Sequence, residues 1–159
     1  MPRNGKHANR VAGEWTLIGA HPGAGTSTLT ALLNHRHDGF ATELIPGVPP
    51  ARDKVVLVAR STPAGAEAVA RMVADWPLAA RPVLCLVADL PLPASRLTRH
   101  RIKAISRQVS AVIGLPYLFA LRNFGDVATA VRHDRKTTRT ARGLHRALAR
   151  LAPAEDTPS

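Results

Sequence analysis

The residues best suited to chemistry form the short stretch AHPGAGTST, from Ala20 to Thr28. Glycines such as Gly23 and Gly25 let the backbone approach an anion closely and turn its N–H groups inward. An apolar run precedes the stretch and a helical pattern follows it, so a helix N-terminus adds its positive dipole end. We therefore expect phosphate groups to contact this loop, at Gly23, Ala24, Gly25, Thr26, Ser27 and Thr28.

This stretch matches the P-loop pattern G-x-x-x-x-G-K-[ST] at two of its four fixed positions. Gly25 takes the second glycine, and Ser27 takes the hydroxyl position that contacts Mg²⁺. Ala20 replaces the first glycine, and Thr26 replaces the lysine. A charge-assisted hydrogen bond is worth roughly 1.5–3 kcal/mol, so loss of the lysine weakens phosphate binding about tenfold to a hundredfold.

The stretch AHPGAGTST resembles the GGVGKST-type loop of ParA/MinD-like P-loop ATPases. The stretches DKVVLVARSTPAGAEAVARMV and VSAVIGLPYLFALRNFGD resemble later parts of those proteins, so the likeness spans residues 15–126. The whole chain is similar to short uncharacterised actinobacterial proteins with a GAHxGAGxST loop. The resemblance implies a P-loop-NTPase-like fold and ATP or GTP with Mg²⁺ as ligand, the metal contacting Ser27. It also places His21, where those ATPases have a second lysine, beside the phosphates, with its protonated form supplying some of the lost charge.

Two departures from that pattern argue against efficient nucleotide hydrolysis. The run Val55 to Ala59 ends in Arg60, so no Walker B aspartate follows it, and Asp38 is the only carboxylate at a switch-like position. Phosphoryl transfer needs groups that position water and neutralise developing charge. We expect a nucleotide-binding pseudo-ATPase or regulatory scaffold without catalytic residues. The alternative for the loop itself is a close-packed turn that binds no ligand.

A row of arginines marks the C-terminal segment. At about 100° per residue, one helical stripe holds the five residues Arg135, Arg139, Arg142, Arg146 and Arg150. Ala141, Leu144, Leu148 and Leu151 fall on the opposite side. Aligned guanidinium groups suit a nucleic-acid backbone without reading its sequence. The alternative function is thus a DNA-associated accessory protein in which the glycine loop is vestigial.

The overall charge fits either function. The chain has 22 Lys and Arg against 11 Asp and Glu, a formal net charge of +11. Such a charge attracts polyanions, including nucleic acid and acidic membrane surfaces, but an Arg-rich and Ala-rich composition can also produce it. A second basic cluster, from Arg96 to Arg107, is better explained as a solvated helix face.

The apolar pattern indicates an α/β fold. Runs without polar alternation, typical of strands buried on both faces, lie at 16–20, 55–59, 83–88, 111–115 and 117–121. Helical patterns lie between the first three of these runs. Thr62 is the expected N-cap of one of these helices, and Pro63 takes its first position. Residues 38–50 are expected to form a loop with at most a short strand at 43–45. The order predicts one small domain with a mostly parallel sheet flanked by helices.

The ends and the single cysteine complete the expected organisation. We expect disordered tails at 1–11 and 153–159, a P-loop-like domain at 12–125, and a basic amphipathic helix at 126–152 packed on that domain. Cys85 lies in an apolar run, where a thiol behaves as a small hydrophobe. No stretch is long enough for a signal peptide core or a membrane span, which favours a cytoplasmic protein. Asp89 follows a predicted strand and is either a ligand contact or a turn residue.

Overall fold

Five parallel strands form the centre of the molecule. The computed structural model describes residues 15–44 and 54–152, so the expected tails and Ile45 lie outside the described residues. The short strand expected at 43–45 lies two residues earlier, at Ala41–Glu43. The strand order is β2-β1-β3-β4-β5. The strands are β1 (Trp15–Gly19), β2 (Ala41–Glu43), β3 (Val55–Arg60), β4 (Val83–Val87) and β5 (Ala111–Leu115). All neighbouring pairs are parallel, which confirms the expected sheet.

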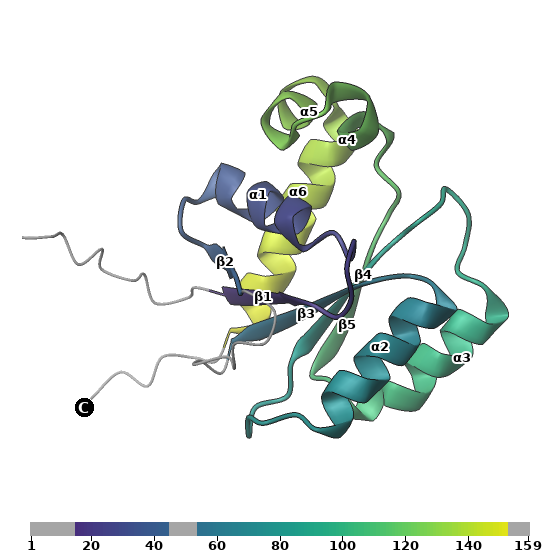
Figure 1. Ribbon diagram of the computed structural model, residues 1–159. Coiled ribbons are helices and arrows are strands. Elements are labelled where there is room, and N and C mark those ends of the chain that lie inside the picture. Colours follow the sequence, from purple (N-terminus) through teal and green to yellow (C-terminus); the bar gives the residue numbers. More distant parts are fainter. Residues whose placement is uncertain (1–14, 45–53, 153–159) are drawn as a thin grey trace, which may run out of the picture.

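Helices cover both faces of this sheet. In chain order they are α1 (Thr26–Arg36), α2 (Pro63–Ala74), α3 (Arg96–Ile105), the 3-10 turn Ser106–Gln108, α4 (Phe119–Phe124), α5 (Val127–His133) and α6 (Arg135–Leu151). Helices α1 and α6 lie on one face, α2 and α3 lie on the other, and α4 and α5 form a lobe beside α1 and α6 (Figure 1). The described chain is therefore a single small α/β domain.

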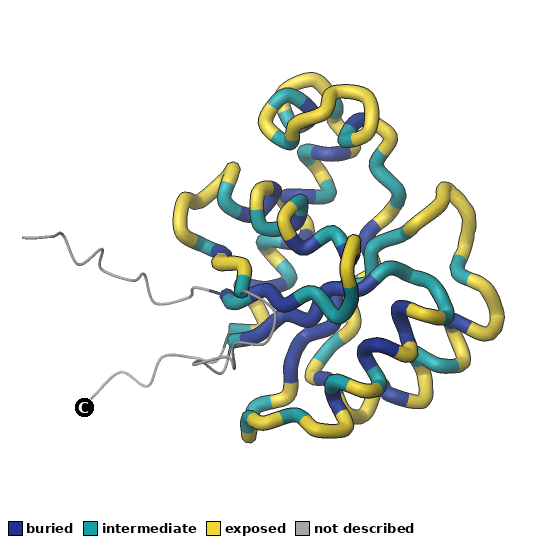
Figure 2. The backbone as a smooth tube through the Cα atoms, viewed as in Figure 1, coloured by how far each residue is buried: buried dark blue, intermediate teal, exposed yellow. Residues whose placement is uncertain are grey.

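The core consists of two apolar layers separated by the sheet. On β3, Val56 and Val58 belong to the layer under α1 and α6. Leu57 belongs to the layer under α2 and α3. Because both faces of the strand are buried, its residues show no polar alternation (Figure 2). Cys85 is fully buried in the first layer, and burial raises the pKa of its thiol to about 12.

Two expectations about the C-terminal third are wrong. The run 117–121 is not a strand, since Pro116 ends β5 and α4 begins at Phe119. An apolar run of five residues does not distinguish a strand from a short helix. The expected single helix at 126–152 is two helices, because Asp134 has an extended backbone and caps α6. Its carboxylate accepts from the backbone N–H (2.8 Å) and the hydroxyl (2.7 Å) of Thr137.

The strand order determines where a ligand can bind. Strand β2 lies on one side of β1 and strand β3 lies on the other side. The loops that follow β1 and β3 therefore lead away from each other. Doubly wound sheets bind ligands in the crevice outside the carboxyl ends of the strands at such a point. The loops after β1, β3, β4 and β5 all lie at this one edge.

Candidate phosphate-binding site

The glycine loop has the backbone geometry that anion binding requires. Gly23 (φ 73°) and Gly25 (φ 97°) both adopt left-handed conformations, which glycine accepts without strain. Gly25 is the N-cap of α1, and no side chain caps this helix end. The N–H groups of the first helical turn lack carbonyl partners within the helix. They are therefore free to contact an anion.

Thr26, at the position of the missing lysine, points inward. Its side chain is only 8% exposed, and a Cβ added to Gly19 would lie 2.7 Å from its Oγ1. Thr26 thus packs the helix start against the end of β1, and Gly19 makes the room. No positive charge comes from this position.

A pocket of about 590 Å³ lies over the loop. Its lining includes every residue expected to contact phosphate, from Gly23 to Thr28, together with His21. Glu43, Leu44 and Arg60 complete the wall from β2 and β3. The structure therefore brings the predicted phosphate contacts together in one concave surface.

His21 links the loop to β3. Its Nδ1 lies 2.9 Å from the carbonyl oxygen of Pro22, and its Nε2 lies 3.0 Å from the backbone nitrogen of Arg60. Because Nε2 accepts the Arg60 N–H, Nδ1 is the nitrogen that donates to Pro22 in this arrangement. In this arrangement His21 positions the loop and presents no free donor to a phosphate.

Arg60 supplies a positive charge that the sequence analysis did not place in the site. Its Nε donates to the carbonyl oxygen of Gly23 over 2.9 Å. Its guanidinium carbon lies 3.8 Å from the position that a Cβ on Gly25 would occupy. The end of β3 therefore places a cation against the start of α1. In the sequence, Arg60 was noted only because it stands where a Walker B aspartate would follow the strand.

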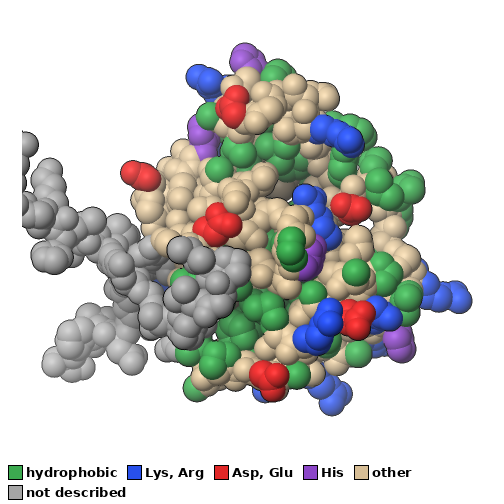
Figure 3. Space-filling model, viewed as in Figure 1, with side chains coloured by type: hydrophobic (Ala, Val, Ile, Leu, Met, Phe, Trp, Pro, Cys, Tyr) green, Lys and Arg blue, Asp and Glu red, His purple; other side chains and the backbone are tan. Residues whose placement is uncertain are grey.

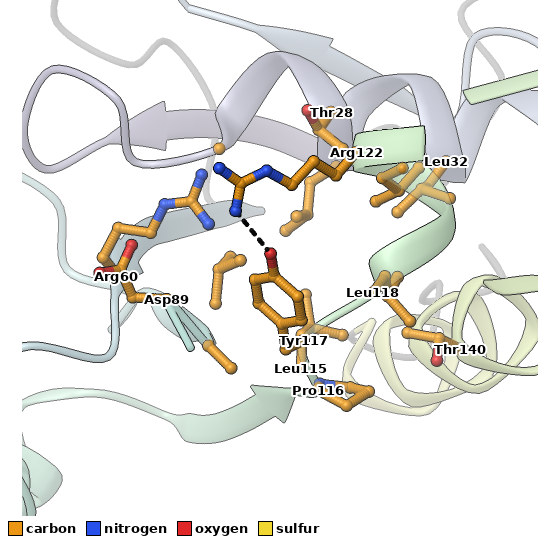
Figure 4. A pocket seen from close by; sticks show the side chains of 15 residues that line it. Thr28, Leu32, Arg60, Asp89, Leu115, Pro116, Tyr117, Leu118, Arg122 and Thr140 are labelled. Carbon is orange, nitrogen blue, oxygen red and sulfur yellow. Dashed lines mark hydrogen bonds between the residues drawn. The ribbon is translucent and has the colours of Figure 1, made fainter. Parts of the chain in front are cut away.

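A second pocket, of about 340 Å³, adjoins the first and shares Gly25, Thr28 and Arg60 with it. The space-filling view shows a hollow beneath the α4–α5 lobe with basic side chains close to it (Figure 3). Much of the second pocket is apolar, including Leu29, Leu32, Val87, Leu115, Leu118 and Leu121. Asp89 lies at its rim beside Arg60 (Figure 4).

Arg122 enters this second pocket from α4. Its Nη1 donates to the hydroxyl of Tyr117 over 3.2 Å, and its side chain points toward that of Arg60 (Figure 4). The hydrogen bond to Tyr117 raises the pKa of Arg122 above its ordinary value. Both residues lie in the stretch VSAVIGLPYLFALRNFGD, but neither was expected to contact a ligand.

The carboxylate nearest the loop is Glu43. Ser27 Oγ donates to both of its carboxylate oxygens, over 3.2 and 3.0 Å. Asp38, the expected switch carboxylate, follows the far end of α1, about 16 Å along the helix from the loop. A pairing of β2 with β1 brings Glu43 to this place, and short-range patterns do not reveal it.

Comparison with known proteins supplies no family for this chain. No family model matches it, and no curated protein or solved structure shows significant similarity to it. Its function is therefore inferred from the geometry of its own residues.

The expected arginine row lies on the outer side of α6. All five members, Arg135, Arg139, Arg142, Arg146 and Arg150, are exposed, while Ala141, Leu144 and Leu148 are buried against the domain. Within residues 15–44 and 54–152, none of the five has a carboxylate within 4.0 Å. Arg101 of the second basic cluster differs, because it bonds Pro63 O (2.9 Å) and pairs with Glu67 (3.6 Å).

The described residues were also compared with the requirements of a metal site and of a membrane-spanning helix. Among these residues, no group of three or more His, Cys, Asp or Glu side chains is arranged to hold a metal ion. The described helices include none that is both long and apolar enough to cross a bilayer.

The site fits Mg²⁺ poorly. Mg²⁺ requires octahedral oxygen coordination, with one or two carboxylates beside the phosphates. Glu43 already accepts the Ser27 hydroxyl, and the end of β3 presents the cation Arg60. A dication placed beside Gly25 would be repelled by that guanidinium.

Proposed function

We propose that the protein binds the phosphate groups of a nucleotide, ATP or GTP, on the loop from Gly23 to Thr28 and acts as a regulatory scaffold. The observation that carries this proposal is the uncapped start of α1, with left-handed Gly25, inside a pocket of about 590 Å³. Helix N-termini of this kind attract phosphates through free N–H groups and the helix dipole. The likeness of AHPGAGTST to ParA/MinD-like loops points to the same ligand.

The adjoining pocket supports a nucleotide rather than a free phosphate ion. It begins at Gly25 and Thr28 and continues along apolar side chains to Tyr117. A ligand with an anionic end on the loop and an aromatic base fits this sequence of polar and apolar walls.

The residues around the loop support binding without efficient hydrolysis. Thr26 is buried, Arg60 occupies the end of β3, and Ser27 bonds Glu43. Water activation and charge neutralisation together account for most of phosphoryl-transfer catalysis. We expect ATP turnover by the purified protein to stay at the rate of the buffer blank.

The thermal midpoint tests this function. Ligand at about 100 times its dissociation constant adds roughly 2.7 kcal/mol to the free energy of unfolding, a shift of several degrees in a domain of this size. ATP, GTP and their diphosphates are added in millimolar amounts to the wild type and to Gly25→Val. Gly39→Val is the matched control, because Gly39 is also left-handed (φ 75°) and follows the opposite end of α1.

Three results decide the outcome. A shift that Gly25→Val abolishes and Gly39→Val retains supports phosphate binding on the loop. Absence of any shift, or an equal shift in all three proteins, contradicts it. If the Gly25 variant does not fold, Ser27→Val at an exposed loop position replaces it.

A second candidate function is sequence-tolerant binding to DNA by α6. The specific observation is the exposure of all five row arginines without a carboxylate partner in the described ranges. A contact with about four phosphates gives a slope of roughly −3.6 when log affinity is plotted against log salt. The double variant Arg139→Glu/Arg142→Glu should weaken duplex binding strongly.

The control for this second function is Arg96→Glu/Arg99→Glu, which makes the same charge change at exposed positions on α3. Equal losses in both double variants would attribute binding to net charge alone. A flat salt dependence would remove the DNA function.

A further inference from the structure

We propose that Arg60 and Arg122 bind the ligand's phosphate groups without a divalent cation. In this arrangement two guanidinium groups replace both the missing loop lysine and Mg²⁺. The inference rests on the proposed function, since it concerns the same loop. It specifies that the nucleotide binds as a metal-free polyphosphate anion.

The two arginines converge on one place from distant segments. Arg60 ends β3, Arg122 belongs to α4, and both line the pocket that begins at Gly25. Their guanidinium groups point toward one another at the start of α1 (Figure 4). Within the described residues, neither has a carboxylate within 4.0 Å, and Asp89, beside Arg60 at the rim of the pocket, forms no ion pair with it. Two cations that face each other in one pocket repel, and an anion between them converts this repulsion into attraction.

Both side chains are held in position yet keep donors available. Arg60 uses Nε on the carbonyl of Gly23, which leaves its terminal amino groups toward the pocket. Arg122 uses Nη1 on the hydroxyl of Tyr117, which leaves Nε and Nη2. Planar guanidinium forks match phosphate oxygens in pairs, whereas a lysine offers one point charge. The arginine pair is thus a chemically sufficient replacement for the lysine.

The surroundings favour an anion over a metal–anion complex. Where a cation beside the loop would need a carboxylate, the end of β3 carries Arg60. The Ser27 hydroxyl donates to both carboxylate oxygens of Glu43, which takes up part of their acceptor capacity. Chelation of the ligand by Mg²⁺ would reduce the negative charge that the two arginines attract. Free ATP should therefore bind at least as tightly as Mg-ATP.

The test measures ATP and pyrophosphate affinity by calorimetry at physiological ionic strength, once with millimolar Mg²⁺ and once with EDTA. We expect equal or tighter binding in EDTA. Arg60→Gln and Arg122→Gln should each weaken binding about tenfold to a hundredfold, as expected for one charge-assisted contact. Arg71→Gln removes the same charge from an exposed position on α2 and should leave the affinity unchanged.

The outcomes separate this inference from the proposed function. Binding that requires Mg²⁺ and disappears in EDTA overturns the arginine pair but leaves the nucleotide function intact. Binding of equal strength in the wild type and both Gln variants also overturns the pair. No binding in either buffer removes the proposed function itself. If loss of the Gly23 contact unfolds Arg60→Gln, the exposed Arg122 variant still decides the question.

Discussion

His145 is a titratable residue of α6 that packs against the residues after the C-terminal end of α1. Its ring stacks on His37 (centroids 4.5 Å apart) and contacts Phe40 (4.1 Å). Within the described residues its Nε2 is buried without a hydrogen-bond partner. Burial, followed by the positive charges of His37 and Arg36, lowers the pKa of His145 below its ordinary value of 6.5.

This pKa shift predicts acid sensitivity. Well above pH 6.5 this ring is neutral in both the folded and the unfolded protein. As the pH is lowered through 6.5, the unfolded chain takes up the proton first, so the free energy of unfolding decreases. We expect the thermal midpoint to drop between pH 7.5 and 5.5. His145→Phe keeps the stacking without titrating and should flatten the pH dependence. His35→Gln, at an exposed position, should not change it. Parallel curves for wild type and His145→Phe would contradict the assignment.

At the scale of elements, the start of α2 packs unusually closely on β3. Thr62 caps this helix by accepting from the Gly65 N–H over 3.0 Å, and Pro63 occupies its first position. A Cβ added to Gly65 would lie 2.2 Å from the carbonyl oxygen of Arg60. Helix α2 can therefore lie this close to the sheet only because Gly65 has no side chain. The same contact supports the end of β3 that carries Arg60.

Two glycine substitutions should have opposite effects. Gly65→Ala forces α2 away from the end of β3 and should lower the free energy of unfolding by roughly 1–3 kcal/mol. Gly143→Ala lies on exposed α6, where an added Cβ meets nothing within 4 Å, and should raise it by about 0.5–1 kcal/mol. Urea unfolding followed by circular dichroism gives both values. Similar effects at the two sites would show that helix propensity, and not the β3 contact, dominates.

At the scale of the whole molecule, the positive charge is mostly uncompensated. The net charge is +11, and the ion pair of the described residues, Arg101 with Glu67, is partly exposed and weak. Like charges on one surface repel and destabilise the compact state, and salt screens them over a Debye length of about 10 Å at 0.1 M.

Salt should therefore stabilise the protein. We expect the thermal midpoint to rise as sodium chloride increases from low to physiological concentration, because screening reduces self-repulsion. Sodium phosphate at matched ionic strength should raise it further, since phosphate also binds between Arg60 and Arg122. A midpoint that stays level or falls in chloride would show that repulsion does not limit stability. Equal shifts in both salts would count against an anion site.

The sequence by itself determined those features that depend on neighbouring residues. Apolar runs predicted the strands β1, β3, β4 and β5, the glycines predicted the loop before α1, and the spacing of arginines predicted the exposed row on α6. Cys85 was expected to be buried because its own strand is apolar throughout. Such patterns suffice because a strand's burial, a turn's dihedral angles and a helix's faces follow from local residue types.

Only the tertiary structure decided the composition of the candidate site. It brought Glu43 to Ser27, paired Arg60 with His21, and placed Arg122 in the same pocket as Arg60. These contacts join residues that are far apart in the chain. They depend on the order of the strands and the lengths of their connections, which no local pattern of residue types contains.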